Sequence, residues 1–160
     1  MTEILSSFES ENENKWYTIN DDVMGGISDS QFYVNDEKIG IFKGEVSLEN
    51  NGGFASCRMD LNSQSLFKSF KLKVKGDQKT YKFRVISQEG ITFQKTFDTT
   101  SDWSEIELQF QDFQAVFRGR LLNYKTPKYL NPRSIGILIS DKQEGNFELK
   151  IDWIKGALFN

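Results

Sequence analysis

The sequence of 160 residues contains no histidine, one cysteine and two prolines. Without histidine, the chain cannot carry a Ser-His-Asp or Cys-His catalytic group, an imidazole general base or a His-ligated haem. With Cys57 as the single thiol, it has no intrachain disulfide, no Cys-x-x-Cys redox pair and no thiolate zinc cluster. The chemistry left open is that of carboxylates, of oxygen-ligated metals, or of binding without catalysis. We predict neither a cofactor nor a metal site.

The charge and hydropathy of the sequence exclude further classes of protein. The net charge of −3 is too small to indicate disorder or a nucleic-acid-binding protein. No apolar run approaches the 18 residues of a membrane span. The first fifteen residues carry Glu3, Glu9, Glu11 and Glu13 against Lys15, unlike a secretory signal or a basic transit peptide. We therefore expect a cytoplasmic protein that binds no nucleic acid.

The chain alternates apolar and polar residues with a period of two, which is typical of half-buried strands. Phe70, Leu72 and Val74 alternate with lysines, and the same pattern recurs along the chain. Turn residues separate the runs too closely for helical crossovers, which need a dozen or more residues. The pattern predicts one all-β domain over residues 1–160, an antiparallel β-sandwich with little helix. The expected strands also include residues 39–48, 54–61, 81–85, 91–97, 106–110, 135–139 and 147–153, with Trp153 in the core.

Basic residues gather in two blocks. Residues 68–84 hold seven basic residues and one acid, which we interpret as the solvated outer face of a hairpin turning at 76–78. Residues 113–140 hold five basic residues and no acid, around an irregular stretch that contains Tyr124 and Tyr129. Such a loop can bind an anion or a sugar, and it can equally be a solvated surface loop.

Three short segments carry the polar residues that a site would need. Residues 20–28, Asn-Asp-Asp-Val-Met-Gly-Gly-Ile-Ser, join two acids to a double glycine but lack the ligand spacing of an EF-hand, so a tight loop explains them. Residues 48–56 contain Asn-Gly between two alternating runs, the strongest short hairpin signal. Residues 117–120, Phe-Arg-Gly-Arg, present two arginines that suit a carboxylate or phosphate, or an internal acid such as Asp152 or one of Asp21 and Asp22.

Taken in order, these segments resemble the CIA30 family, the complex I intermediate-associated protein 30 domain. The resemblance rests on Trp16, on residues 20–28, 42–44 and 48–56 with Arg58, and on Trp103, 117–120 and 145–152. It implies a galactose-binding-like jelly roll, as in many carbohydrate-binding modules. It also implies a role without catalysis, because the mitochondrial member is an assembly chaperone for respiratory complex I.

Our first hypothesis is a non-enzymatic binding or assembly module. It would recognise a protein partner, such as a respiratory-complex subunit, or a small polar ligand through loops at one end of the sandwich. The alternative role for these polar side chains is a buried network that fixes loop geometry. The candidate binding residues are Asp21, Asp22, Asn50, Asn51, Arg58, Arg118 and Arg120.

Two other functions stay open. A carbohydrate-binding module would show an exposed Trp or Tyr platform on a concave sheet face. A glycosidase-like enzyme would need two carboxylates in one cleft, about 5–9.5 Å apart. Spacing selects no pair among the acids, so the candidates are chosen by residue type alone: Asp21, Asp22, Glu45, Glu49 and Asp152.

Overall fold

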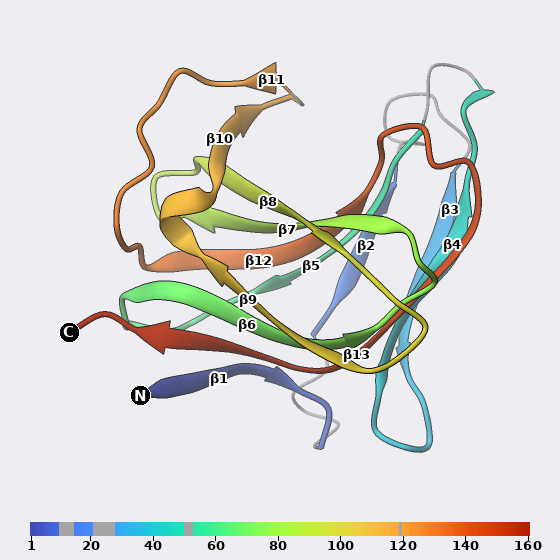
Figure 1. The fold of residues 1–160 in the computed structure, drawn as a ribbon, viewed down its shortest axis with the longest axis horizontal. Coiled ribbons are helices and arrows are strands. Elements are labelled where there is room, and N and C mark those ends of the chain that lie inside the picture. The colour runs from blue at the N-terminus through green and yellow to red at the C-terminus, as the bar shows by residue number, and fades with distance from the viewer. Residues whose placement is uncertain (10–14, 21–27, 50–52, 119) are drawn as a thin grey trace.

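A computed structural model (Figure 1) describes residues 1–9, 15–20, 28–49, 53–118 and 120–160. Within these residues the chain forms thirteen β-strands and one 3₁₀ turn, η4 (Phe110–Asp112). Every strand pairing is antiparallel, and the strands build two sheets. The predicted β-sandwich with little helix is confirmed.

The first sheet has six strands and centres on a long last strand. β13 pairs with β4 through residues 145–151 and with β1 through residues 153–157, while its other edge pairs with β6. The sheet order is β3-β4-β13-β6-β9, with β1 beside β13. The bounds are β1 (Thr2–Ser7), β3 (Asp29–Val34), β4 (Gly40–Val46), β6 (Phe67–Lys75), β9 (Ser104–Gln109) and β13 (Gly145–Leu158).

The second sheet has seven strands in the order β11-β10-β8-β7-β12-β5-β2. Its centre is formed by β7 and β12, and its outermost strands are the short β11 and β2. In Figure 1, β10 and β11 rise at one side of this sheet. The bounds are β2 (Tyr17–Asn20), β5 (Ala55–Asp60), β7 (Thr80–Ser87), β8 (Thr92–Asp98), β10 (Gln114–Phe117), β11 (Arg120–Leu121) and β12 (Pro132–Ile139).

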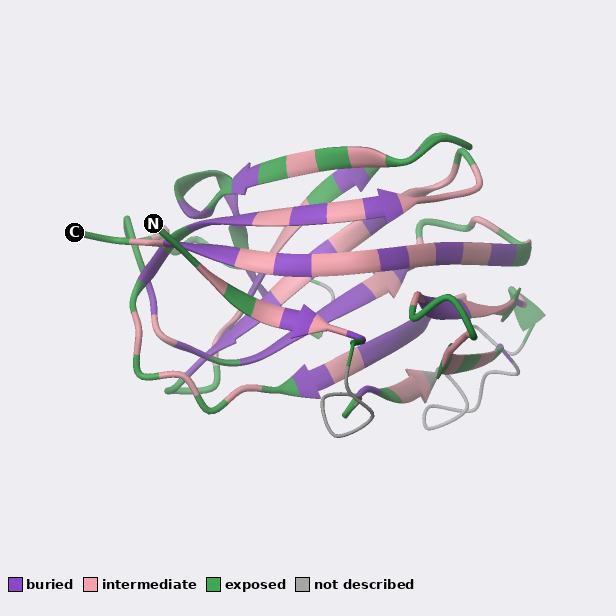
Figure 2. Ribbon diagram, turned by 90° about the horizontal axis from the view of Figure 1, so that it is seen from below, coloured by how far each residue is buried: buried purple, intermediate pink, exposed green. Residues whose placement is uncertain are grey.

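The core lies between the inner faces of the two sheets, where alternate residues of each strand are buried (Figure 2). Phe70 of β6 and Phe83 of β7 are fully buried, and their ring centroids lie 5.4 Å apart across the two sheets. Trp16 closes one end of this core. Its ring stacks on Phe32, and its indole N–H donates to Ser6 Oγ at 3.0 Å. Each buried aromatic side chain stabilises the fold by roughly 1.5–3 kcal/mol.

Two predicted hairpins are wrong. The Asn-Gly signal within residues 48–56 suggests that the flanking strands pair, but β4 belongs to the six-stranded sheet and β5 to the seven-stranded sheet. The basic block 68–84 likewise spans β6 and β7, which lie in different sheets. Each segment therefore connects a strand of one sheet to a strand of the other. Which strands pair is decided by burial of the apolar faces of both sheets against each other. A turn signal in the sequence carries no information about this burial.

The prediction that Trp153 lies in the core is also wrong. The pairing of β13 with β6 shifts register between Ile151 and Trp153, so one extra residue enters the strand. Trp153 thereby joins Lys73 and Lys155 on the outer face. The Lys155 ammonium lies 4.2 Å from the centroid of the Trp153 ring.

Candidate functional site

Four of the predicted site residues, Asp21, Asp22, Asn50 and Asn51, lie outside the described residues. The described ends of their two segments do lie side by side. Strand β2 pairs with β5, and β3 pairs with β4. In addition, Ser28 Oγ accepts a hydrogen bond of 3.0 Å from the Ser47 N–H. The two motif segments therefore join the same two pairs of strands.

Arg58 lies on β5 of the seven-stranded sheet, next to the edge strand β2. In β5 it pairs with Tyr17 of β2 and with Gly136 of β12, and Gly136 pairs on its other side with Arg84 of β7. Paired residues project from the same face of a sheet, so Arg58 and Arg84 flank Gly136 on the outer face. Both side chains line one small pocket together with Ser56, Cys57, Ile86 and Gly136. We call Arg58 and Arg84 the arginine pair.

The guanidinium of Arg84 is poorly satisfied. Its Nε is buried and has no hydrogen-bond partner. Burial lowers the pKa of Arg84, and the positive charge of Arg58 lowers this pKa further. Among the described residues, all four ion pairs are made by lysines and none by an arginine. The arginine pair is thus a concentration of positive charge that no acid of the described residues neutralises by an ion pair.

Neighbouring polar groups on this outer face are already engaged with one another. The Tyr17 hydroxyl donates to Asp60 Oδ1 at 3.3 Å. The Ser56 hydroxyl donates to the Ile19 carbonyl oxygen at 2.7 Å. Lys82 forms an ion pair with Asp141 at 3.1 Å. None of these three contacts involves a guanidinium group of the arginine pair.

The outer face of the six-stranded sheet is different, because its charges pair with each other. Lys71 meets Glu107 at 3.5 Å, and Lys73 meets Asp152 at 3.4 Å. Asp152 therefore pairs with Lys73 and not with Arg118 or Arg120, although the sequence also allowed the latter pairing. This face has the balanced, solvated character of an ordinary protein surface.

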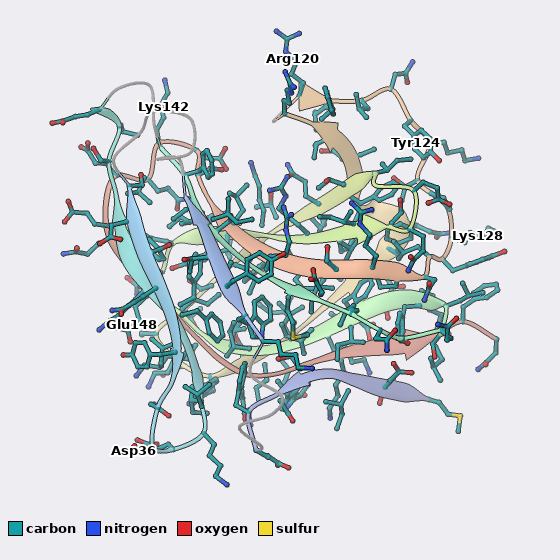
Figure 3. The ribbon with its side chains drawn as sticks, turned by 180° about the vertical axis from the view of Figure 1, so that it is seen from behind. Asp36, Arg120, Tyr124, Lys128, Lys142 and Glu148 are labelled. Atoms are coloured by element: carbon teal, nitrogen blue, oxygen red, sulfur yellow. The ribbon has the colours of Figure 1, made fainter. Side chains whose placement is uncertain are left out.

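Arg118 and Arg120 lie on the hairpin that β10 and β11 form, and both are exposed (Figure 3 labels Arg120). The Arg118 guanidinium carbon lies 5.3 Å from the centroid of the Phe117 ring. Phe117, which is 61% exposed, pairs with Arg120 on one face of the hairpin, and Leu121, which is 62% exposed, pairs with Val116 and projects from the other face. We call this set the hairpin surface, and it comprises Phe117, Arg118, Arg120, Leu121, Leu122 and Tyr124.

The structure does not bring Arg58 together with Arg118 and Arg120. Strands β12, β7 and β8 separate β5 from β10, so Arg58 lies about 19 Å from the hairpin at the usual strand spacing. The described candidates thus form two separate sites. Sequence reasoning missed Arg84, which it assigned to a solvated basic block. A usable signal was Gly136, because a glycine inside a strand pattern marks a close approach of backbone or ligand.

The carboxylates proposed for an enzyme do not meet in the described part of the chain. Asp152 is bound to Lys73, and Glu45 pairs with Asn146 at the other end of β13, about 20 Å away along the strand. No group of three or more metal-ligating side chains occurs in the described ranges. In those ranges there is also no helix long and apolar enough to cross a membrane.

The sequence matches the family described as Complex I intermediate-associated protein 30 (CIA30) over residues 6–151. The chain belongs to the CIA30 family. A search of curated protein sequences finds no match. The resemblance deduced from the motifs is therefore confirmed at the level of the family.

Solved structures similar to this CIA30 chain are carbohydrate-binding modules. A family 11 module of the cellulosomal cellulase Lic26A-Cel5E of Clostridium thermocellum aligns with 99% of this chain and 95% of its own, at 15% identity and a TM-score of 0.71. A family 29 module aligns with 98% and 91%, at 11% identity and a TM-score of 0.60. At such identities the likeness concerns the fold alone, and it agrees with the β-sandwich described above.

Proposed function

We propose that this CIA30 chain is a non-enzymatic assembly module of the cytoplasm that binds a protein partner on the hairpin surface. The partner is an acidic segment with apolar side chains, carried by a subunit or intermediate of a respiratory complex. The observation that carries the proposal is the exposure of Phe117, which shares a face of the hairpin with Arg120, next to the exposed Arg118 and Leu121. The family to which the chain belongs supports the assembly role.

The apolar side chains of the hairpin surface favour a macromolecular partner. Exposed apolar patches that are rimmed by polar groups are typical of interaction sites. Beside the patch lies an open hollow of about 300 Å³, lined in part by Leu121, Leu122 and Tyr124. A hollow of this size accommodates a large side chain of a partner. Aromatic and arginine side chains also dominate the energetics of protein interfaces.

Charge selects the kind of partner. Residues 113–140 contain five basic residues and no acid, so the hairpin surface and the loop that follows attract negative charge. Strand β11 is moreover the edge of its sheet, with one paired side. An extended segment can add to such an edge through backbone hydrogen bonds. An acidic segment in extended conformation fits both features.

Asp21, Asp22, Asn50 and Asn51 form a second part of the proposal. Their motif segments connect the same strand pairs, β2–β5 and β3–β4. Polar loops positioned by a rigid sheet commonly carry recognition. We assign these residues to partner contacts that are independent of the hairpin surface, and Asp22→Ala tests them.

Carbohydrate binding is the alternative that the fold suggests. A sugar platform requires several exposed aromatic rings on one sheet face. On the outer face of the seven-stranded sheet, the described residues offer one such ring, Tyr17, which is 42% exposed. Trp103 precedes β9 of the other sheet, and Trp153 lies under Lys155. The distribution of aromatic side chains therefore favours a protein partner.

Site-directed photo-crosslinking in the native host tests the proposal. A photoreactive residue at Leu121 should capture one defined protein, whereas the same residue at Tyr33, exposed on the other sheet, should not. The captured protein is then purified and its affinity measured. Arg118→Glu together with Arg120→Glu should weaken binding at least about tenfold, because two charge-assisted contacts are reversed.

The matched control is Lys43→Glu with Lys71→Glu, an equal change of charge on the other sheet. Thermal melts establish that each variant is folded. Equal affinity of the wild type and the Arg118→Glu, Arg120→Glu variant for the purified partner would refute the hairpin surface. Saturable binding of a neutral oligosaccharide, with no protein captured at Leu121, would establish the carbohydrate alternative instead.

A further inference from the structure

The arginine pair is arranged around a glycine. Arg58, Gly136 and Arg84 occupy one row across β5, β12 and β7, so the two arginine Cα atoms lie about 10 Å apart. The lack of a side chain at Gly136 leaves the floor between them open. A Cβ atom at Gly136 would lie 2.7 Å from the Cys57 carbonyl oxygen, so the close backbone approach requires glycine.

The arginine pair lacks the partners that buried or half-buried charge normally has. A donor that is buried without an acceptor destabilises the folded protein, and Arg84 Nε is such a donor. Two positive charges that line one pocket also repel each other. In the described part of the chain, no carboxylate forms an ion pair with either arginine. Both unfavourable features disappear when an anion enters between the guanidinium groups.

The pocket also restricts what can enter. It is narrow, with Ile86 as an apolar wall, and the Ser56 hydroxyl is directed at the Ile19 carbonyl oxygen. Its space matches one oxygen atom, not a whole sugar ring or an amino-acid side chain. Guanidinium forks match carboxylate and phosphate oxygens in geometry as well as in charge.

We propose that Arg58 and Arg84 bind one oxyanion, a carboxylate or phosphate group of a small ligand, with one of its oxygens in the pocket above Gly136. The Arg84 Nε–H and the guanidinium groups of both arginines donate to it. This site goes beyond the protein-binding role of the hairpin surface. Arg84 lies on β7, which β8 separates from β10, and Arg58 lies two strands further away, so either site can exist without the other.

Nuclear magnetic resonance of the arginine side chains tests the proposal directly. The ¹H–¹⁵N signal of Arg84 Nε is followed during separate titrations with sodium phosphate, sodium acetate and sodium chloride at constant ionic strength. We expect a saturable downfield shift of the Arg84 signal with phosphate or acetate and none with chloride. The anion that saturates at the lower concentration identifies phosphate or carboxylate as the ligand group.

Three variants make the outcome specific. Arg58→Gln and Arg84→Lys should each weaken the binding of the anion by about tenfold or more, as loss of a charge-assisted donor predicts. Arg133→Gln removes one positive charge from an exposed position of β12 and should leave the affinity unchanged. An unshifted Arg84 signal in both oxyanions would overturn the proposal. Equal affinities in the wild type and the folded Arg58→Gln variant would also overturn it.

Because these titrations use small anions and no partner protein, their failure would not bear on the hairpin surface. Conversely, the Arg118→Glu, Arg120→Glu variant should bind the oxyanion as the wild type does. A loss of oxyanion binding in that variant would contradict the separation of the two sites.

Discussion

Replacing Arg84 by methionine should make the protein more stable. Arg84 lies on β7 with its Nε buried and without an acceptor, beside the like charge of Arg58. Methionine keeps an unbranched stem of similar length, so contacts of the aliphatic part with the sheet are largely retained. What the substitution removes is the charge and the unsatisfied donor.

The size of the stability change follows from the loss of the unsatisfied donor and the loss of the charge. Removal of an unsatisfied buried donor is worth about 1–3 kcal/mol. Relief of repulsion with Arg58 has the same sign, whereas imperfect packing of the new side chain opposes both. We expect a net increase of about 1–2 kcal/mol in the free energy of unfolding, in line with the replacement of buried charges by apolar groups. For a chain of this length, that corresponds to roughly 2–8 °C in melting temperature.

Urea unfolding followed by tryptophan fluorescence measures the free energy, in a buffer free of phosphate and carboxylates. The control is Arg133→Met, an exposed position of β12 where the change should stay within about 0.5 kcal/mol. A loss of more than about 1 kcal/mol in Arg84→Met would show that Arg84 is held by stabilising contacts, and the reasoning would fail. Added phosphate or acetate should stabilise the wild type and not the variant.

Three further outcomes are expected. Gly44→Ala should cost about 1–3 kcal/mol in urea unfolding, because its Cβ would collide with the backbone carbonyl of Asp29 on β3; an unchanged midpoint would contradict this. Burial and the nearby Asp77 carboxylate raise the pKa of Tyr81. The folded state therefore keeps a proton that the unfolded state releases, so the free energy of unfolding should fall as the pH rises above about 10. Absorbance at 295 nm in wild type and Tyr81→Phe checks this, since the Tyr81 phenolate should appear only with unfolding. Burial also raises the pKa of the Cys57 thiol, so a thiol reagent at pH 8 should label it only after unfolding; rapid labelling of the folded protein would refute the burial.

The sequence predicted the fold class because burial on one face leaves a period of two along each strand. The alternations at Phe70–Val74 and at residues 135–139 correspond to β6 and β12. Strand partners could not be predicted, since alternation shows which face is buried and not which sheet the strand joins. Short or irregular elements such as β2, β10 and β11 carry too few residues to show a period. The extra residue between Ile151 and Trp153 reverses the faces that the alternation predicts for the end of β13, and alternation alone does not show such a bulge.

The site was predicted only in part. Arg58, Arg118 and Arg120 came from motif segments, and the structure places them at two separate positions. Arg84 carries no local mark that separates it from the lysines of its block. Its importance arises from long-range pairing through Gly136, which joins residues 26 positions or more apart. In a single sequence Gly136 marks a close approach, but nothing shows which residues of other strands lie beside it.

The central place of β13 has a consequence for the making of this protein. β13 separates β4 from β6 and holds β1, yet it comes last among the strands. On the ribosome, β1, β4 and β6 must therefore wait with an open side until residues 145–158 have emerged. At typical rates of synthesis, several seconds or more pass between the appearance of β4 and the arrival of β13. The nascent chain thus exposes the edges of these strands through most of its synthesis, and open strand edges are sites of aggregation.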